Sequence, residues 1–268
     1  MNSTVADAGE MRSGNPALSE QFIAEHLTPQ AASRPMTVGG VAIKTLVFLI
    51  VVVAGGAWGW ASATETVPPE VGGGYGDTTV TIPGGFWLAS FGALLVGIAI
   101  AMSPRRAAVL GFLYAVLQGF CLGAISASFN AQTDGIVSAA VLSTVCVFAV
   151  ALLLYATRII RPTQKLLFAL TAGIGGLSLL YLFTFVLSIF NWGWLYSESF
   201  RTIGIIVTVI AVVLAALSLT FDFATIEAGV RASAPKDLEW YLAYSLMVTL
   251  IWLYIELLRL LALLSRNR

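Results

Sequence analysis

Two acidic residues in apolar surroundings are the candidates for chemistry in this chain. Asp222 directly follows an uncharged run at residues 203–221, and Glu256 lies inside a second run at 240–264. A charged side chain is costly in hydrocarbon and usually serves an ion or proton pathway. No basic residue lies within one helical turn of Asp222, so this acid is the first candidate for ion transfer and pH sensing.

Glu256 has two explanations that the sequence leaves open. Arg259 lies three residues further along the same helix face and could neutralise the carboxylate. Alternatively, Glu256 and Arg259 line the outer half of a polar path, with Thr249 seven residues before Glu256 on the same face.

The composition places these residues in a lipid bilayer. Hydrophobic residues make up 58% of the 268 residues and charged residues 10%, and the mean hydropathy is +0.89. Soluble domains contain roughly 25% charged residues. The chain is therefore predicted to be a membrane protein with direct lipid contact.

Seven segments have the roughly 17 to 25 residues that a helix needs to cross hydrocarbon. The sequence predicts an all-α polytopic membrane protein, a seven-transmembrane-helix bundle over residues 41–268. Residues 1–40 have no apolar core and are predicted to form a flexible cytoplasmic tail. The predicted spans are 45–61, 86–102, 107–129, 136–156, 166–190, 203–221 and 240–264.

The basic residues predict the orientation, because short loops rich in Lys and Arg stay on the cytoplasmic side. With the N-terminus inside, ten of the 14 basic residues fall on the inner side. The other four, Arg201, Arg259, Arg266 and Arg268, fall towards the outside. We expect a cell (plasma or inner) membrane protein with a cytoplasmic N-terminus, although Arg266 and Arg268 would favour an inner C-terminus.

The sequence argues against an enzyme. His26 is the single histidine and lies in the tail, so a Ser/His/Asp triad and an H-E-x-x-H metal site are excluded. Residues 74–77 spell the Gly-x-Gly-Asp signature of intramembrane aspartyl proteases, which need two carboxylates on facing helices. Asp77 instead lies in a Pro/Gly-rich loop at 62–85, so we interpret the match as coincidental.

Other polar and small residues have structural explanations. Cys121 and Cys146 are single cysteines within spans and predict neither a disulfide nor a zinc site. No cofactor, metal or nucleic-acid partner is expected. Gly119 and Gly123 form a Gly-x-x-x-Gly motif that favours close helix packing. The solvated connection between the last two helices is predicted to contain Glu227, Arg231, Asp237 and Glu239.

Several segments together resemble the Bax inhibitor family, in its bacterial YccA-like branch. They are 114–126 (YAVLQGFCLGAIS), 221–230 (FDFATIEAGV) and 252–261 (WLYIELLRLL), with Asn15 to Leu18 near the start. The resemblance covers most of the chain from Asn15 onward. It implies a seven-helix bundle in which six helices surround the last. It also implies a pH-sensitive calcium or proton leak controlled by acids on the last two helices.

The resemblance places the family's acids on this chain with two departures. Asp222 matches the acid at the end of the sixth helix, whereas the second acid position falls on Glu256 or on Thr249, depending on the register. If Glu227 and Trp240 mark the inner interface, Asp222 lies ~7 Å deep, Thr249 ~13 Å and Glu256 ~24 Å at about 1.5 Å per residue. A direct pair of Asp222 with Glu256 is therefore not expected.

The second departure is Gln118, which stands where many relatives carry Glu. An amide keeps hydrogen-bonding capacity but does not titrate. A path lined by Gln118 would therefore be less acidic than in those relatives.

Two functions from different classes remain. The first is a passive cation leak, for calcium or protons, that is gated by Asp222. The second is a membrane-embedded regulator in stress or cell-death control, which binds other membrane proteins such as a quality-control protease through its tail and outer helix faces. We favour the cation leak, because an unpaired acid inside the membrane is costly. A leak would make use of that acid, whereas a protein that only binds partners would not require it.

Overall fold

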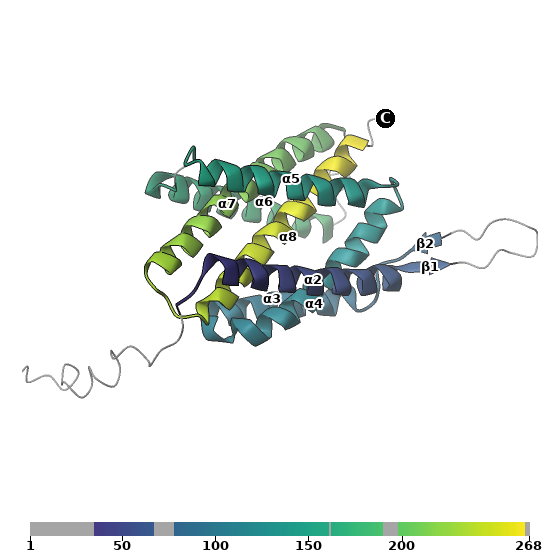
Figure 1. Cartoon of the computed structure of the whole chain (residues 1–268). Helices are drawn as coiled ribbons and strands as arrows, with labels where there is room; N and C mark the ends of the chain where they lie inside the picture. The colour runs from purple at the N-terminus through teal and green to yellow at the C-terminus, as the bar shows by residue number, and fades with distance from the viewer. Residues whose placement is uncertain (1–34, 67–77, 161, 190–197, 266–268) are drawn as a thin grey trace, which may run out of the picture. The chain divides into compact units, whose positions relative to one another are not determined.

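The computed structural model describes residues 35–66, 78–160, 162–189 and 198–265, and it is an all-α polytopic membrane protein with one short β-ladder (Figure 1). Six helices are long and apolar enough to cross a membrane, and α3 is apolar but has 17 residues. The helices are α2 (Val38–Ala63), α3 (Phe86–Met102), α4 (Ala107–Asn130), α5 (Ile136–Ala156), α6 (Gln164–Ile189), α7 (Glu198–Arg231) and α8 (Leu238–Ser265), with a 3-10 turn, η2 (Pro104–Arg106), before α4.

The compact unit begins at Met36, so part of the predicted tail belongs to the folded domain. Helix α2 starts at Val38 because Thr37 caps it, with the Thr37 hydroxyl accepting a hydrogen bond from the Gly40 amide at 2.9 Å. Residues 1–34 lie outside the described part of the chain. So do Arg266 and Arg268.

The last helix, α8, occupies the centre of the unit Met36–Arg268. It packs against α2, α4, α5 and α7, and in Figure 1 it crosses between α2 and α5. Its side chains Ala243, Met247 and Leu253 have no exposed surface. Helix α6 lies at the periphery and packs mainly against α7. The candidate site residues of α8 are therefore held by several neighbouring helices.

Helices α2 and α4 approach each other until their backbones touch. A Cβ atom on Gly119 would collide with the carbonyl oxygen of Val52, and one on Gly123 would collide with the carbonyl oxygen of Gly56. Close backbone approach increases van der Waals contact, on which helix association in lipid depends. The Gly-x-x-x-Gly motif thus lies at a contact inside the bundle.

The loop at 62–85 is not entirely irregular, which corrects the sequence interpretation. Strands β1 (Thr64–Thr66) and β2 (Thr78–Val80) pair antiparallel, with Thr64 opposite Val80. Threonine and valine favour strands because they are branched at Cβ. The segment 67–77, which includes Asp77, lies outside the described residues.

Helix α7 continues ten residues beyond the predicted end at Phe221, so Asp222 lies inside a 34-residue helix. The apolar run stops at the first charge, but buried side chains continue at helical spacing with Leu219, Phe223 and Ile226. An isolated acid does not end a helix, and this buried stripe stabilises the extension. The helix ends where Ser233 adopts a φ of 51° and the Ala234 amide donates to the Gly229 carbonyl at 3.0 Å.

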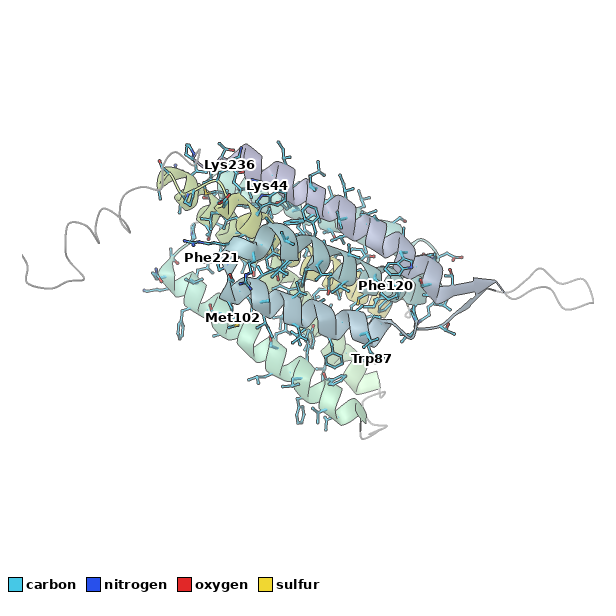
Figure 2. The ribbon with its side chains drawn as sticks, turned by 90° about the horizontal axis from the view of Figure 1, so that it is seen from below. Lys44, Trp87, Met102, Phe120, Phe221 and Lys236 are labelled. Carbon is cyan, nitrogen blue, oxygen red and sulfur yellow. The ribbon has the colours of Figure 1, made fainter. Side chains whose placement is uncertain are left out.

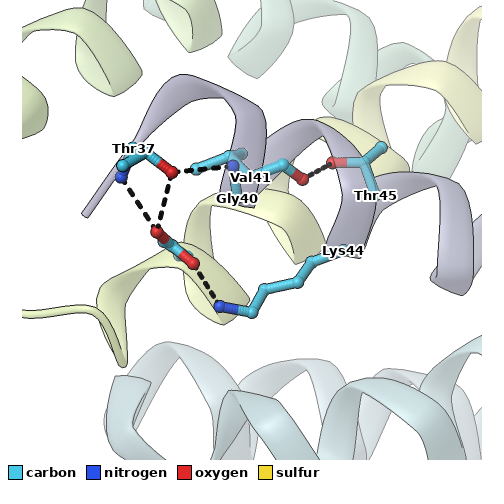
Figure 3. A network of polar contacts seen from close by, with 6 residues as sticks. Thr37, Gly40, Val41, Lys44 and Thr45 are labelled. Carbon is cyan, nitrogen blue, oxygen red and sulfur yellow. Dashed lines mark hydrogen bonds and ion pairs between the residues drawn. The ribbon is translucent and has the colours of Figure 1, made fainter. Parts of the chain in front are cut away.

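Glu239 is not in a solvated connection, which is a second correction. Its side chain is 1% exposed and accepts hydrogen bonds from the Thr37 amide at 2.8 Å and the Thr37 hydroxyl at 3.3 Å (Figure 3). It also forms an ion pair with Lys44, whose ammonium group lies 5.0 Å from the centre of the Trp240 ring. This network joins the start of α2 to the start of α8.

Candidate ion pathway

Asp222 of α7 lies at the contact between α7 and α8. Its Oδ1 accepts a hydrogen bond from the Ser245 hydroxyl of α8 at 3.0 Å. Its Oδ2 is buried and has no hydrogen-bond partner among the described residues. One carboxylate oxygen is therefore satisfied and the other is not.

The partner of Asp222 is a residue that the sequence interpretation missed. Thr249, a candidate for the family's second acid position, donates its hydroxyl to the Ser245 carbonyl at 3.2 Å and lies close to the Asp222 carboxylate. Ser245 lies one turn before Thr249 on the same face of α8. That spacing is the signal from which Ser245 could have been found.

Glu256 lies in a different polar cluster, which we call the Glu256 cluster: Tyr181, Trp252, Glu256 and Arg259. Glu256 is 2% exposed, and both of its carboxylate oxygens accept hydrogen bonds from the Tyr181 hydroxyl of α6, at 3.1 and 3.0 Å. Trp252 Nε1 donates to Oε1 at 3.2 Å. Three helical residues further on, Arg259 Nη1 lies 3.6 Å from Oε2, and its guanidinium group lies 4.8 Å from the centre of the Tyr181 ring.

The two acids have separate partners and form no hydrogen bond with each other. Ser245 and Glu256 are eleven residues apart on α8, which corresponds to a rise of about 16 Å. Arg259 contacts Glu256, as the neutralising explanation requires. Asp222, which bonds Ser245, and Glu256 therefore lie at two different heights along α8.

Gln118 belongs to neither cluster. It is half-buried on α4, and its side chain makes no hydrogen bond with another described residue. The neighbouring Gly119 packs against α2.

A third polar group lies near the α7–α8 turn and was also missed. Glu227 accepts hydrogen bonds from the Tyr155 hydroxyl of α5 and from Arg231, one helical turn later. Its side chain is 41% exposed. Glu227 and Arg231 thus belong to helix α7 rather than to the connection to α8, and Glu227 contacts α5.

The described residues offer no group of three His, Cys, Asp or Glu side chains that could hold a metal ion. A bound calcium ion normally takes six to eight oxygen ligands. Cys121 is buried beside the Ser90 hydroxyl at 3.3 Å, and Cys146 is exposed on α5.

Comparison with known proteins gives one family. The sequence model of the family described as Bax inhibitor 1 like matches residues 15–266. No curated protein matches the chain.

Proposed function

Because the chain belongs to the Bax inhibitor 1 like family, we propose that it lets cations, calcium ions or protons, pass a membrane passively, and that Asp222 makes this leak sensitive to pH. The proposal is for a protein without enzymatic activity. That the chain belongs to the YccA-like branch of this family stays a prediction.

The observation that carries the proposal is the unequal bonding of the Asp222 carboxylate. When ionised, this side chain holds a negative charge with one buried, unsatisfied oxygen, which favours an approaching cation. When protonated, it loses that charge and gains an O–H donor. The α7–α8 contact therefore differs between the two protonation states, which is the requirement for a pH switch.

The polar face of α8 supports a route between the two acids. Ser245, Thr249, Trp252 and Glu256 follow one another at spacings of four, three and four residues, so they lie on one face of the helix. Asp222 contacts the first of them, and Tyr181 contacts the last. A cation that leaves Asp222 would meet hydroxyl groups and then a second carboxylate.

The basic residues support the proposed orientation. Lys44 and Lys236 lie towards the same end of the unit (Figure 2). Arg105 and Arg106 precede α4, and Arg158 follows α5, so helix alternation brings them to that end as well. Under the positive-inside rule this end faces the cytoplasm. We infer a cell membrane location with the N-terminus inside and Asp222 nearer to that side.

Calcium flux into proteoliposomes across a pH series tests the proposal. We expect flux that changes with pH in the unmodified protein and loses that dependence in Asp222→Asn, which keeps the shape but cannot ionise. Asp134→Asn is the matched control, because Asp134 is an exposed acid between α4 and α5.

Two outcomes would contradict the proposal. Equal pH dependence in the unmodified protein and Asp222→Asn would remove Asp222 from the mechanism. Absence of both calcium and proton flux at every pH, with folded protein confirmed, would exclude the leak. The regulator that binds membrane proteins, such as a protease, would then be the remaining expectation.

A further inference from the structure

The Glu256 cluster differs from the Asp222 site because both of its carboxylate oxygens have partners. Glu256 Oε1 accepts hydrogen bonds from the Tyr181 hydroxyl at 3.1 Å and from Trp252 Nε1 at 3.2 Å. Oε2 accepts from the same hydroxyl at 3.0 Å and lies 3.6 Å from Arg259 Nη1. One oxygen of Asp222, by contrast, has no partner among the described residues. Each oxygen of Glu256 thus faces two donor groups.

This arrangement leaves Glu256 no free oxygen for a metal cation. A calcium ion binds oxygen ligands at about 2.3–2.6 Å, closer than the donors now lie, so it can bind only if a donor moves away. The Arg259 guanidinium opposes the ion further, because the two carry charges of the same sign. This group also lies 4.8 Å from the centre of the Tyr181 ring, so Arg259 and Tyr181 hold each other beside the carboxylate.

Tyr181 lies on a helix that few packed side chains hold in place. Among the described residues of α6 three are buried, Leu170, Leu177 and Leu187, whereas α8 has ten buried residues over a similar length. Helix association in lipid depends on such packing. Helix α6 packs mainly against α7. A movement of α6 can therefore withdraw the Tyr181 hydroxyl from Glu256 while α8 stays in its central position.

We propose that the Glu256 cluster closes the route for calcium ions, and that α6 moves away from α8 when an ion passes. Glu256 lies about 16 Å along α8 from Ser245, the partner of Asp222. The route then has two controls at different heights, the charge of Asp222 and the position of α6. Tyr181 and Arg259 are positioning residues, because they act through Glu256. This inference rests on the proposed leak and adds a contact in which Asp222 takes no part.

Tyr181→Phe tests the closure, because it removes the hydroxyl and leaves Asp222 and Ser245 unchanged. A hydrogen bond between membrane helices contributes ~0.6 kcal/mol on average, and about 1.4 kcal/mol corresponds to tenfold. Calcium flux into proteoliposomes should therefore rise about threefold. The factor should be the same at every pH, because Asp222 still sets the pH dependence. Retention of a large trapped dye in the same vesicles checks that the bilayer stays intact.

Tyr254→Phe is the matched control. The Tyr254 hydroxyl also links α8 to another helix, since it bonds the Ser126 hydroxyl of α4 at 2.7 Å. Tyr254 precedes Glu256 by two residues, so the two side chains do not share a face of α8. Tyr254→Phe should lower stability to a similar extent and leave calcium flux unchanged. A purely structural role of Tyr181 would make the two variants alike.

A reversible cross-link between α6 and α8 tests the movement. Tyr181→Cys and Arg259→Cys are combined, because these two side chains are in contact, in a chain whose Cys121 and Cys146 are replaced by serine. This protein lacks the closing contacts and should pass more calcium than the unmodified one. A bifunctional methanethiosulfonate that joins the two cysteines should stop the flux, and a reducing agent should restore it. A monofunctional methanethiosulfonate, which adds bulk without a cross-link, should leave the flux high.

Two results would overturn the closure and leave the leak in place. One is a pH-dependent calcium flux in the unmodified protein that Tyr181→Phe leaves unchanged or lowers. The other is full flux in the cross-linked protein. Absence of calcium flux from the unmodified protein, from Tyr181→Phe and from the reduced double-cysteine variant, with folded protein confirmed, would instead overturn the calcium leak and the closure together.

Discussion

The Tyr181 hydroxyl of α6 lies within hydrogen-bond distance of both carboxylate oxygens of Glu256 on α8, at 3.1 and 3.0 Å. Because α6 packs mainly against α7, this contact is a direct polar link between the peripheral helix and the central one. Arg259 adds to it, with its guanidinium group over the Tyr181 ring. The position of α6 is therefore coupled to the polar face of α8.

Tyr181→Phe should weaken this link. The substitution removes the hydroxyl, while Glu256 keeps its contacts with Trp252 and Arg259. We expect the free energy of unfolding to fall by about 0.6 kcal/mol, the average for side-chain hydrogen bonds between membrane helices, and by no more than about 1.7 kcal/mol. If the Glu256 cluster closes the proposed pathway, calcium flux should also rise, because α6 is held less firmly.

Tyr114→Phe is the control for this change, since the Tyr114 hydroxyl bonds no described residue. Unfolding is followed by loss of helical circular dichroism in detergent, and flux is followed in proteoliposomes. Equal stability of Tyr181→Phe and the unmodified protein would show that the link does not hold α6.

Ser245→Ala should show in which charge state of Asp222 the hydrogen bond from Ser245 contributes most to stability. Ser245 donates to an oxygen of Asp222, and that bond is worth most when the carboxylate is ionised. Protonated Asp222 can donate a bond of its own and needs Ser245 less. The loss of stability should therefore be larger at about pH 8 than at about pH 5.

Thermal unfolding at the two pH values measures this difference. Ser218→Ala is the matched control on α7, because the Ser218 hydroxyl donates only to the Leu214 carbonyl of its own helix, at 2.9 Å. A loss that is the same at both pH values in Ser245→Ala would mean that Asp222 does not change its charge in this range.

The sequence predicts the ends of a helix well where turn-forming residues flank an apolar run. The bounds of α3 and α5 agree with the prediction, because Gly85 and Gly135 directly precede these runs and Pro104 closely follows α3. The end of α7 was missed because Asp222 interrupts the apolar run but not the helix.

Contacts between distant segments could not be predicted from local pattern. Glu239 is buried because Lys44, 195 residues earlier in the chain, neutralises it. Tyr181 likewise meets Glu256 across 75 residues. Ser245 was missed for a different reason: the family register offers Thr249 on this face of α8, whereas the Ser245 hydroxyl, one turn earlier, bonds Asp222 here.

Gly123→Ala should disrupt the contact between α2 and α4. The added methyl group would collide with the Gly56 carbonyl, and neither backbone can rotate away as a side chain would. Overpacking of this kind typically costs about 1–3 kcal/mol. The yield of folded protein and its thermal unfolding would show the loss.

Gly175→Ala is the matched control within α6. A Cβ atom there meets nothing within 4 Å, and Ala is favoured over Gly in a helix by about 0.8–1.0 kcal/mol. This variant should therefore be as stable as the unmodified protein or more so. Equal destabilisation of both variants would contradict close packing as the reason for Gly123.

Lys44→Met should destabilise the protein through Glu239 rather than through loss of the lysine itself. It leaves Glu239, which is 1% exposed, as a buried carboxylate without its ion-pair partner. Removal of one member of a buried pair costs about 3–5 kcal/mol. Lys165→Met is the control, because Lys165 is exposed near the start of α6 and should tolerate the change.

The double variant Lys44→Met with Glu239→Gln separates the two contributions. Gln keeps an oxygen that can accept from the Thr37 amide but carries no charge. We therefore expect the double variant to be more stable than Lys44→Met alone, with less than additive losses in a double-mutant cycle. Additive losses would show that Lys44 and Glu239 stabilise the start of α2 independently.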